Sequence, residues 1–530
     1  MAKSTKKKSN TIKTIGAYIL FMIVPFIALL ILSAITKINP FHLDAWSSND
    51  SAWNDEIGYY NAVKAMRLYG KMPGVPGYNE VEALKTSFGP YNPFTYMPYV
   101  VFSFVTGIGS HNFMIYCNVL MMLVAGLLFL LLVRPDIRTT MALILFSLSS
   151  LMVWRFTWSG MSECNIIMMM VIVLGITHVL SEEEKEERMS VKNTILMGIM
   201  ILLILFYGII RPYLLALILF PLFLIFRKKH LSKIKKVIFS VCLILFSGAS
   251  FGLYQYMVEY HCTKFFQQNG MSVSELLSQG PVGIVLYVGE MNRTAIQFII
   301  EDFTEGSGWI GAVMLCLLLE LILLFVFFIH ELWLAKREHD RLSSKGWICF
   351  LFGMITIAVY EATIVLYTVR QCHRMMLAFL FVTGLCICLY GEWKNRVLVV
   401  LMSVVVLSME FFIPQNLEGW YVPTSSAQQS AAFEQMQSEL AAAIPGKGED
   451  AWDNTVLEIP YNSQKILYCL PDYVTINSYD VRTMSEKIDQ NDIRSKYILI
   501  YDKRGDMARM CMTKYKSLWE NEDFILFQIR

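Results

Sequence analysis

The apolar run at residues 308–334 reads GWIGAVMLCLLLELILLFVFFIHELWL, and this stretch decides the fold class. A helix of roughly 17–25 predominantly apolar residues is long enough to cross the hydrocarbon core of a membrane. Similar runs recur along the chain, at residues 15–35, 113–133, 140–154, 164–180, 194–210, 212–226, 237–256, 347–369, 375–391 and 397–413. The sequence therefore predicts a mainly α fold, a polytopic helical membrane protein with about 11 transmembrane helices.

The composition agrees with a membrane protein. Of the 530 residues, 55% are hydrophobic and only 17% are charged, which excludes a disordered chain and argues against a soluble one. The formal net charge of +2 gives no indication of a nucleic-acid partner. Lys6, Lys7 and Lys8 precede the first run, which is longer than the apolar core of a signal peptide and lacks a small-residue cleavage site. We therefore expect a retained signal anchor.

Lysine and arginine are distributed unevenly between alternate loops. With the N-terminus in the cytoplasm, roughly twenty-two of these residues fall in cytoplasmic loops and about six in the short outer turns. The cytoplasmic loops are then 1–13, 134–138, 181–193, 227–236, 335–346 and 391–396. The positive-inside rule therefore predicts a multi-pass protein of the cell membrane, with loops 37–111 and 257–307 and the C-terminal residues 414–530 outside the cytoplasm.

Residues 414–530 differ in character from the rest of the chain. Pro414 ends the last apolar run, and residues 425–443 are polar and rich in alanine, as in a helix. Three short runs rich in β-branched and aromatic residues indicate buried strands. They are residues 455–459, 497–501 and 524–527. We therefore expect two domains, a transmembrane domain at 1–413 and a small extracytoplasmic α/β domain at 414–530.

The first outer loop, 37–111, holds an acidic pair among aromatic residues, in the segment Trp53-Asn54-Asp55-Glu56-Ile57-Gly58-Tyr59-Tyr60. Apolar residues recur at every third position from Ile57 to Met66, which predicts a helix over 55–69 on the membrane surface. The acidic pair has two interpretations. It caps this helix, where the helix dipole favours an acid, or it supplies a catalytic base. The short run 99–108 is expected to dip into the membrane interface.

The chain resembles the GT-C glycosyltransferases in one motif and in its topology. The motif is the pattern Asp55-Glu56-x-x-x-Tyr60-x-x-Val63-x-x-Met66-x-x-x-Gly70, followed by Tyr96-x-Pro98. The group includes protein O-mannosyltransferases and lipid A aminoarabinose transferases. Its members share a cytoplasmic N-terminus, a long first outer loop with an acidic residue and often an outer C-terminal domain. The Trp-Trp-Asp signature of oligosaccharyltransferases is absent here, which argues against that branch.

The resemblance implies a function and a catalytic residue. Enzymes of this group transfer a sugar from a polyprenyl-phosphate donor to an acceptor hydroxyl, usually with inversion at the anomeric carbon. A carboxylate takes the acceptor proton. The resemblance assigns this role to Asp55, with Glu56 beside it and Tyr60 among the substrate-binding residues; Asp44 and Asp50 are the alternatives. It leaves the extracytoplasmic acceptor open between a protein, a wall polymer and a glycolipid.

The departing lipid phosphate needs positive charge. The outer turns supply Arg211, Arg370, His373 and Arg374 as candidate ligands. Arg370 and Arg374 are spaced i, i+4 and would share one helix face. The group often has an arginine–tyrosine pair followed by prolines at this place, whereas Arg374 is followed by Met375. The alternative interpretation is that the arginines anchor the helices to lipid headgroups.

Ionisable residues within the apolar runs, or at their ends, usually face a cavity or a partner. Glu361 lies in the outer half of run 347–369, and Glu163 precedes run 164–180 close to Asn165. Glu361 and Glu163 are therefore candidate substrate-binding residues. Glu320 lies near the middle of run 308–334, and it or Glu361 is expected to pair with a buried arginine.

The sequence predicts neither a metal site nor a cofactor. It contains no Cys-x-x-Cys, no zinc-type spacing of cysteine and histidine, and no Asp-x-Asp. A divalent cation at Asp55 and Glu56 is the alternative, and the lipid-phosphate sugar is a substrate. Most of the 11 cysteines lie in apolar runs as small hydrophobic residues. Cys469 and Cys511 lie in the C-terminal segment and are candidates for a disulfide.

Other functions remain open at this point. A transporter or flippase of lipid-linked sugars would also have many spans and intramembrane charges, but more often shows internal repeats, which the sequence lacks. A cell-envelope polysaccharide polymerase or ligase usually has its large loop late in the chain. A structural scaffold would not require acidic residues and arginines on the same outer side. The partners that we expect are the membrane, a polyprenyl-phosphate sugar and an extracytoplasmic acceptor.

Overall fold

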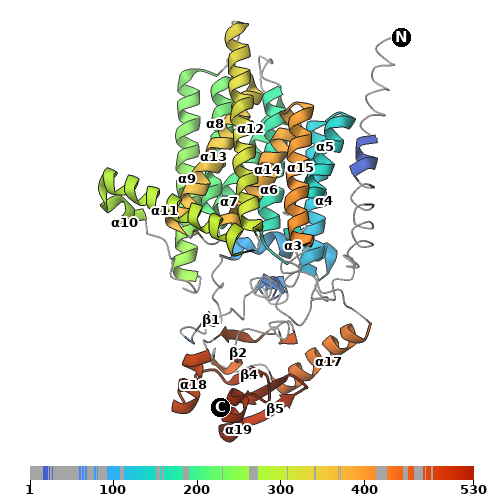
Figure 1. The fold of residues 1–530 in the computed structure, drawn as a ribbon, viewed down its shortest axis with the longest axis vertical. Coiled ribbons are helices and arrows are strands. Elements are labelled where there is room, and N and C mark those ends of the chain that lie inside the picture. The colour runs from blue at the N-terminus through green and yellow to red at the C-terminus, as the bar shows by residue number, and fades with distance from the viewer. Residues whose placement is uncertain are drawn as a thin grey trace.

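The computed structural model consists of a helical bundle with a small sheet domain at one end (Figure 1). The longer described segments are 92–107, 113–150, 160–182, 190–228, 231–261, 273–306, 308–338, 342–367, 372–412, 427–445, 452–458, 473–478 and 481–529. Shorter described pieces lie at 16–21, 23, 27, 59–60, 62–64, 66–67, 77–78, 80, 156–157, 369 and 469–471. We call the end of the bundle next to the sheet domain the sheet side.

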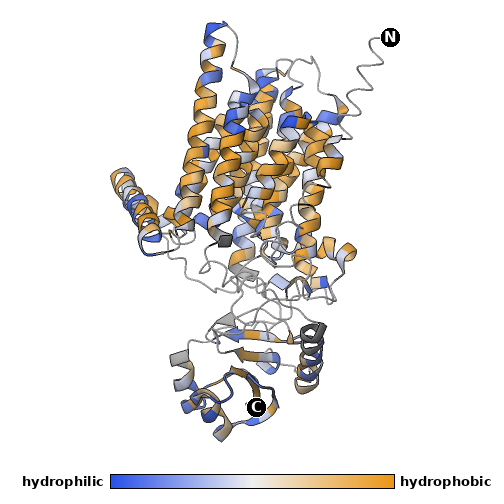
Figure 2. Cartoon of the chain, turned by 45° about the vertical axis from the view of Figure 1, so that its right-hand side comes forward, coloured by the Kyte–Doolittle hydropathy of each residue, from blue (hydrophilic) through white to orange (hydrophobic). Residues whose placement is uncertain are grey.

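Seven helices among these residues are long and apolar enough to cross a membrane. They are α4 (Phe113–Val133), α6 (Glu163–Glu182), α7 (Val191–Ile210), α9 (Lys233–His261), α12 (Trp309–Arg337), α13 (Ser344–Leu366) and α14 (Cys372–Tyr390). Two further helices, α5 (Ile137–Ser149) and α15 (Trp393–Phe412), pack against each other in the same bundle. In Figure 2, hydrophobic residues predominate along the helices of the bundle. The chain is a multi-pass membrane protein, and the predicted mainly α class with a small C-terminal α/β part is confirmed.

The helices α6 and α14 form the centre of the bundle. Most of the apolar residues of both are buried, whereas α9 exposes most of its surface. A helix that is apolar all round is expected in such a central position. The two helices contact each other, and each begins on the sheet side. Side chains in their first turns therefore meet at the centre of the bundle. Most of the predicted run 15–35 lies outside the described residues.

The predicted span 212–226 is not a single α-helix. A 3-10 helix, η4 (Pro212–Ile218), precedes the short helix α8 (Leu219–Arg227). Pro212 ends α7 because the residue before a proline is pushed out of the helical region. The chain then turns back tightly, since a Cβ at Gly208 would lie 2.2 Å from Leu215 Cδ2. A 3-10 helix of this length is uncommon and often marks a functional position.

The close contact at Gly208 predicts a stability effect. Gly208→Ala is expected to cost about 1–3 kcal/mol, because the new methyl group overlaps Leu215 and lies 2.9 Å from Ser250 Oγ. Gly198→Ala on the same helix is the matched control, since nothing lies within 4 Å of a Cβ there. Thermal unfolding in detergent measures both variants. An equal melting temperature in the two variants would contradict the tight turn.

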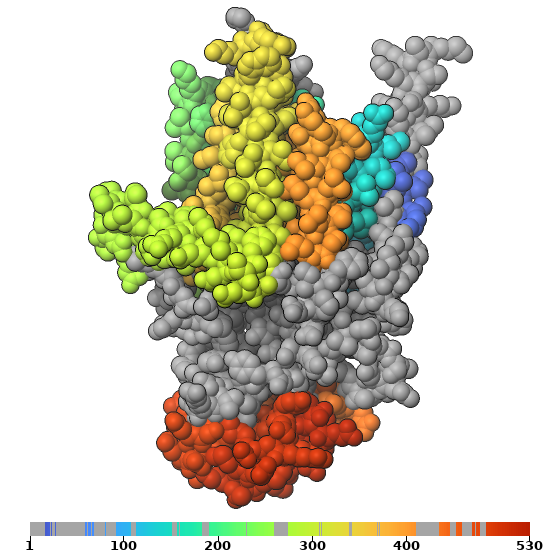
Figure 3. Space-filling model, viewed as in Figure 1, coloured from blue at the N-terminus to red at the C-terminus, as the bar shows by residue number. Residues whose placement is uncertain are grey.

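The predicted outer loop 257–307 contains two helices that the sequence did not predict. They are α10 (Val273–Ser278) and α11 (Gly280–Thr304), and α11 runs across the sheet side of the bundle (Figures 1 and 3). Ala295 and Phe298 pack inward, while Glu290 and Glu301 are exposed. A separate exposed stripe is apolar and comprises Val282, Val285, Leu286, Ile296, Ile300 and Phe303. A buried face, an exposed charged face and an exposed apolar face fit a helix in the membrane interface. The helix was not predicted because these faces mix apolar and charged residues along the sequence.

The first loop contributes a strand to the sheet domain. Among the described residues, six strands have the order β1-β3-β2-β4-β6-β5. They are β1 (Gly77–Tyr78), β2 (Thr455–Glu458), β3 (Thr475–Ser478), β4 (Tyr497–Tyr501), β5 (Lys516–Glu520) and β6 (Phe524–Gln528). The strands β1 to β4 pair in parallel, and β5 and β6 are antiparallel. The three predicted strands are confirmed as β2, β4 and β6, whereas β1, β3 and β5 were not predicted.

Both faces of this sheet are buried. Along β4, Tyr497 and Leu499 join the large core that continues into the bundle, and Ile498 and Ile500 join a second core. The second core lies under α18 (Val481–Gln490) and α19 (Asp506–Lys514). The predicted C-terminal helix is α17 (Ala427–Ala443), which contacts β5. Burial on two faces explains why β4 and β6 are continuous apolar runs in the sequence.

The candidate disulfide between Cys469 and Cys511 is not formed. Both thiols are reduced and buried, Cys469 in the large core and Cys511 in the second core. The two thiols therefore belong to opposite faces of the sheet. Burial raises the pKa of Cys469 to about 12, and it raises the pKa of Cys511 to about 12.

These two thiols are expected to resist alkylation in the folded protein. At pH 8 both are almost fully protonated, and the thiolate is the reactive form. N-ethylmaleimide should therefore label Cys469 and Cys511 slowly until the protein is denatured, and then completely without a reductant. Peptide mass spectrometry measures the labelling. Absence of label after denaturation, reversed by a reductant, would show a disulfide instead.

Candidate functional site

A cavity lies on the sheet side between α6, α7 and α14, with about 450 Å³ of empty space that includes open solvent at its mouth. It brings together three residues that the sequence singled out, Glu163, Arg211 and Arg374. Its remaining lining residues are Ile166, Tyr213, Tyr367, Met375 and Ala378. Three helices that are distant in the sequence thus deliver two arginines and a carboxylate to one cavity.

Glu163 and Arg374 form an ion pair at this cavity. Arg374 donates from Nη2 and Nε to Glu163 Oε1, at 2.9 Å and 3.2 Å, and both side chains are 11% exposed. Glu163 begins α6, where the helix dipole favours an acid. Arg374 lies in the first turn of α14, where the dipole opposes a cation. The carboxylate of Glu163 therefore offsets the cost of placing this arginine at the cavity.

The second oxygen of Glu163 remains available. Glu163 Oε2 is buried and accepts no hydrogen bond in the part of the chain that the structure describes. A buried carboxylate oxygen without a donor is unfavourable unless a ligand or water satisfies it. The cavity therefore offers an acceptor as well as two cations.

Arg211 reaches the cavity from the junction of α7 and η4. Its backbone is extended, with φ −139° and ψ 101°, as expected for a residue that precedes a proline. This conformation turns the chain out of α7 where the helix ends. Tyr213, two residues after Arg211, also lines the cavity. Its ring lies 6.2 Å from the ring of Phe379 on α14. Tyr213 was not predicted as a site residue, although it directly follows Arg211-Pro212 and could have been inferred from that position.

Buried hydrogen bonds fix the start of α6. The main-chain oxygen of Met161 accepts hydrogen bonds from Tyr99 Oη at 2.9 Å and from Asn118 Nδ2 at 3.0 Å. Asn165 Nδ2 donates to the oxygen of Thr95 at 3.3 Å. Tyr99 and Thr95 close the first loop, on α3 (Met97–Thr106) and η1 (Pro93–Thr95). The position of Glu163 thus depends on residues at the end of that loop.

The end of the first loop also contacts α7. Asn92 Nδ2 donates to the main-chain oxygen of Ile209, two residues before Arg211. Asn92 caps η1 through its side-chain oxygen, which accepts from Phe94 N. The short apolar run at 99–108 falls largely in α3, which exposes Val101 and Phe104. The helix that ends at Arg211 and the helix that begins at Glu163 are therefore both contacted by the end of the first loop.

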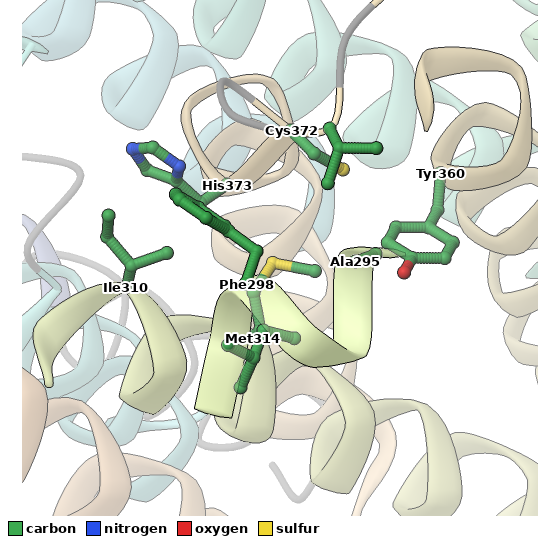
Figure 4. A pocket seen from close by; sticks show the side chains of 9 residues that line it. Ala295, Phe298, Ile310, Met314, Tyr360, Cys372 and His373 are labelled. Atoms are coloured by element: carbon green, nitrogen blue, oxygen red, sulfur yellow. The ribbon is translucent and has the colours of Figure 1, made fainter. Parts of the chain in front are cut away.

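A second, smaller cavity of about 240 Å³ holds His373 (Figure 4). Its other lining residues are Ala295, Phe298, Ile299, Ile310, Met314, Tyr360, Val369 and Cys372. They come mainly from α11, α12, α13 and α14, and most are apolar. His373 thus lies on a different face of α14 from Arg374, and the structure does not bring these two candidates into one cavity.

Glu361 and Tyr60 lie away from both cavities. Glu361 Oε2 accepts a hydrogen bond from Asn292 Nδ2 of α11 at 2.9 Å, so it joins α13 to the interfacial helix. Its observed partner is an amide and not the arginine that the sequence analysis expected. Tyr60 is 3% exposed, and its ring packs 5.3 Å from that of Phe113. Glu320 is 1% exposed within α12 and forms no ion pair with a described residue.

The helix predicted at 55–69 is present where it is described. Tyr59, Tyr60, Ala62 and Val63 are all buried, so this helix lies between the bundle and the sheet domain and not on an open membrane surface. Five of the predicted side chains lie outside the described residues. They are Asp55, Glu56, Arg370 and, among the alternatives, Asp44 and Asp50.

No group of three or more histidine, cysteine, aspartate or glutamate side chains in the described part of the chain is arranged to hold a metal ion. The two cavities hold mainly arginines, tyrosines and apolar residues.

No protein-family model matches this sequence, and no curated protein matches it. Solved structures match most of the chain. ArnT from Cupriavidus metallidurans, in the apo state, is 11% identical with a TM-score of 0.40, covering 97% of this chain and 98% of that chain. The same protein bound to undecaprenyl phosphate is 12% identical with a TM-score of 0.37 over the same shares. The apo oligosaccharyltransferase from Archaeoglobus fulgidus is 10% identical with a TM-score of 0.44, covering 94% and 73%.

The cavity of Arg211 and Arg374 has the chemistry of an oxyanion site. Guanidinium groups bind phosphate oxygens through paired, charge-assisted hydrogen bonds. Arg374 is held in place by Glu163, so little side-chain entropy is lost when an anion binds beside it. The free oxygen of Glu163 and the hydroxyls of Tyr213 and Tyr367 add polar groups around that anion.

Proposed function

We propose that this chain is a membrane glycosyltransferase that moves a sugar from a polyprenyl-phosphate donor to an acceptor hydroxyl. The single observation that carries the proposal is the convergence of Arg211 and Arg374 in one cavity, on helices that the end of the first loop contacts. The same loop bears the acidic motif at Asp55. A phosphate clamp and a base are the two groups that this reaction requires.

The reaction follows from these groups. The acceptor oxygen attacks the anomeric carbon, and a new carbon–oxygen bond forms as the bond to the phosphate oxygen breaks. The electron pair of the broken bond stays on the lipid phosphate, where Arg211 and Arg374 stabilise it. Asp55 takes the acceptor proton. Attack from the face opposite the phosphate inverts the anomeric centre. The proposed donor is of the lipid class that ArnT holds in its solved structure.

The proposal includes a membrane orientation. The charge distribution supports a cytoplasmic N-terminus, with the sheet side of the bundle outside the cytoplasm. The transmembrane domain is then 1–413, and residues 414–530 form an extracytoplasmic domain completed by β1. The proposed acceptor is extracytoplasmic. Its class stays open between a protein, a wall polymer and a glycolipid.

Lipid analysis of a deletion strain tests the proposal. Loss of the protein should cause a polyprenyl-phosphate sugar to accumulate, and mass spectrometry of extracted lipids identifies the sugar. Re-expression of the natural chain should clear the lipid, whereas Asp55→Asn, inserted at the same level, should not. Clearance by Asp55→Asn would contradict a catalytic role for Asp55. A lipid pool that never changes would contradict the function itself.

A further inference from the structure

Glu80 joins the first loop to the sheet domain through a buried carboxylate. Its Oε2 accepts from Arg494 N at 3.1 Å, and its Oε1 accepts from Ser495 N at 2.8 Å and from Ser495 Oγ. Glu80 is 2% exposed. Its partner Arg494 lies 414 residues further along the sequence. A carboxylate is buried at acceptable cost only when donors satisfy it, so this contact is specific to both segments.

The strand beside Glu80 is too short to hold the loop alone. β1 pairs with β3 only at Gly77↔Asn477 and Tyr78↔Ser478. Glu80 itself has φ +49°, a left-handed conformation that is unfavourable for a glutamate. Such a conformation persists where the surroundings impose it. The hydrogen bonds to residues 494 and 495 are therefore the main polar connection at this point.

The downstream end of the same loop contacts the helices that carry the cavity, and a segment upstream of Glu80 is buried in the core. At its downstream end, Asn92 donates to Ile209 O of α7, and Thr95 O accepts from Asn165 of α6. Upstream of Glu80, Tyr59 and Val63 are buried in the core shared with the bundle. The middle of the loop is held by Glu80. Movement of the sheet domain would therefore be transmitted to the loop whose downstream end contacts α6 and α7.

We infer that Glu80 is a positioning residue, through which the sheet domain holds the first loop in the geometry needed for transfer. This inference rests on the proposed function, because the reaction supplies the reason to fix the loop. It assigns a task to the C-terminal domain that is independent of acceptor binding. The sheet domain is then a part of the transfer machinery even for an acceptor that never touches it.

The variant Glu80→Gln tests the inference with little change in shape. Glutamine presents an amide donor where the carboxylate accepted, so one of the main-chain donors at 494 or 495 loses its partner. We expect kcat to fall about 10- to 100-fold, because small misplacements of reacting groups have effects of this size. The KM for the lipid donor should stay within about twofold of the natural value, since the cavity arginines are unchanged.

Glu439→Gln is the matched control in the same domain. Glu439 accepts from Trp519 Nε1 at 2.8 Å and from Gln435 Nε2 at 2.8 Å, and neither partner belongs to the first loop. This variant should turn over at the natural rate. Hydrogen exchange at the amides of residues 494 and 495 should rise about 10-fold or more in Glu80→Gln and stay unchanged in Glu439→Gln.

A disulfide between β1 and β3 tests whether position, and not folding, is what Glu80 supplies. Tyr78→Cys and Ser478→Cys are placed in the Glu80→Gln background, because these residues are directly paired. Oxidation should restore kcat, and reduction should remove the gain.

Three results would overturn the inference. They are faster exchange in Glu80→Gln with a natural kcat, unchanged exchange at residues 494 and 495, and a formed disulfide without rescue. A natural chain that transfers no sugar would refute the proposed function, and the inference with it. The exchange measurement would still show separately whether Glu80 ties the loop to the sheet domain.

Discussion

Replacing Arg374 by methionine is expected to lower kcat for sugar transfer about 10²- to 10³-fold. Arg374 lies in the cavity with its guanidinium 2.9 Å from Glu163, and in the proposed mechanism it stabilises the charge on the departing phosphate. The substitution also leaves Glu163 buried without its cation, which costs about 3–5 kcal/mol of stability for a buried pair. Turnover in detergent and thermal unfolding measure the two effects.

The double variant separates these effects. Adding Glu163→Gln to Arg374→Met removes the unpaired carboxylate, so most of the lost stability should return while kcat stays low. Arg396→Met is the matched control at the opposite end of the bundle, where Arg396 donates to Gly391 O and to Thr139 Oγ1. It should reduce stability with kcat changed by less than about twofold. A double variant with natural kcat would show that Arg374 serves only the structure.

Asp55→Asn is expected to lower kcat about 10²- to 10⁴-fold, the usual range for loss of a general base. Asparagine keeps the size of the side chain and its ability to cap a helix, so the alternative interpretation of Asp55 as a cap predicts almost no change in stability or rate. Binding of the lipid donor should be unchanged, because the proposed phosphate ligands are Arg211 and Arg374. Rates are measured with saturating donor and acceptor.

Two controls accompany this variant. Glu56→Gln tests the neighbouring acid, which is expected to have a smaller effect. Asp44→Asn and Asp50→Asn test the alternatives in the same loop, and a loss of transfer in either, with an active Asp55→Asn variant, would move the base to that residue.

The transmembrane helices were the most predictable part of the fold. The run at 113–133 became α4 with the same ends, because a long apolar segment has few alternatives to a buried helix. The run at 212–226 was predicted as one span, but it begins with a 3-10 helix because of Pro212 and the close contact at Gly208. The interfacial helix α11 was missed because its lipid, protein and water faces mix apolar and charged residues.

The candidate site was predictable in its residue types but not in its pairs. Glu163, Arg211 and Arg374 were recognised because ionisable residues at the ends of spans are costly without a function. The ion pair of Glu163 and Arg374 joins positions 211 residues apart, and no local pattern encodes it. Glu80 could not be predicted for the same reason. Its partners lie in the C-terminal sheet domain, to which the first loop adds the strand β1. His373 was grouped with Arg374 by proximity in the sequence, yet it faces another cavity.

The most direct measurement is turnover of a synthetic polyprenyl-phosphate sugar by the purified protein in liposomes. Mass spectrometry follows the lipid headgroup, and a labelled sugar reports the membrane leaflet. The proposed function predicts that free polyprenyl phosphate appears in equal amount with the glycosylated acceptor, or with water as a slow acceptor, and that Asp55→Asn forms neither. Movement of the intact lipid-linked sugar between leaflets, with its headgroup unchanged, would contradict the transferase and show a flippase.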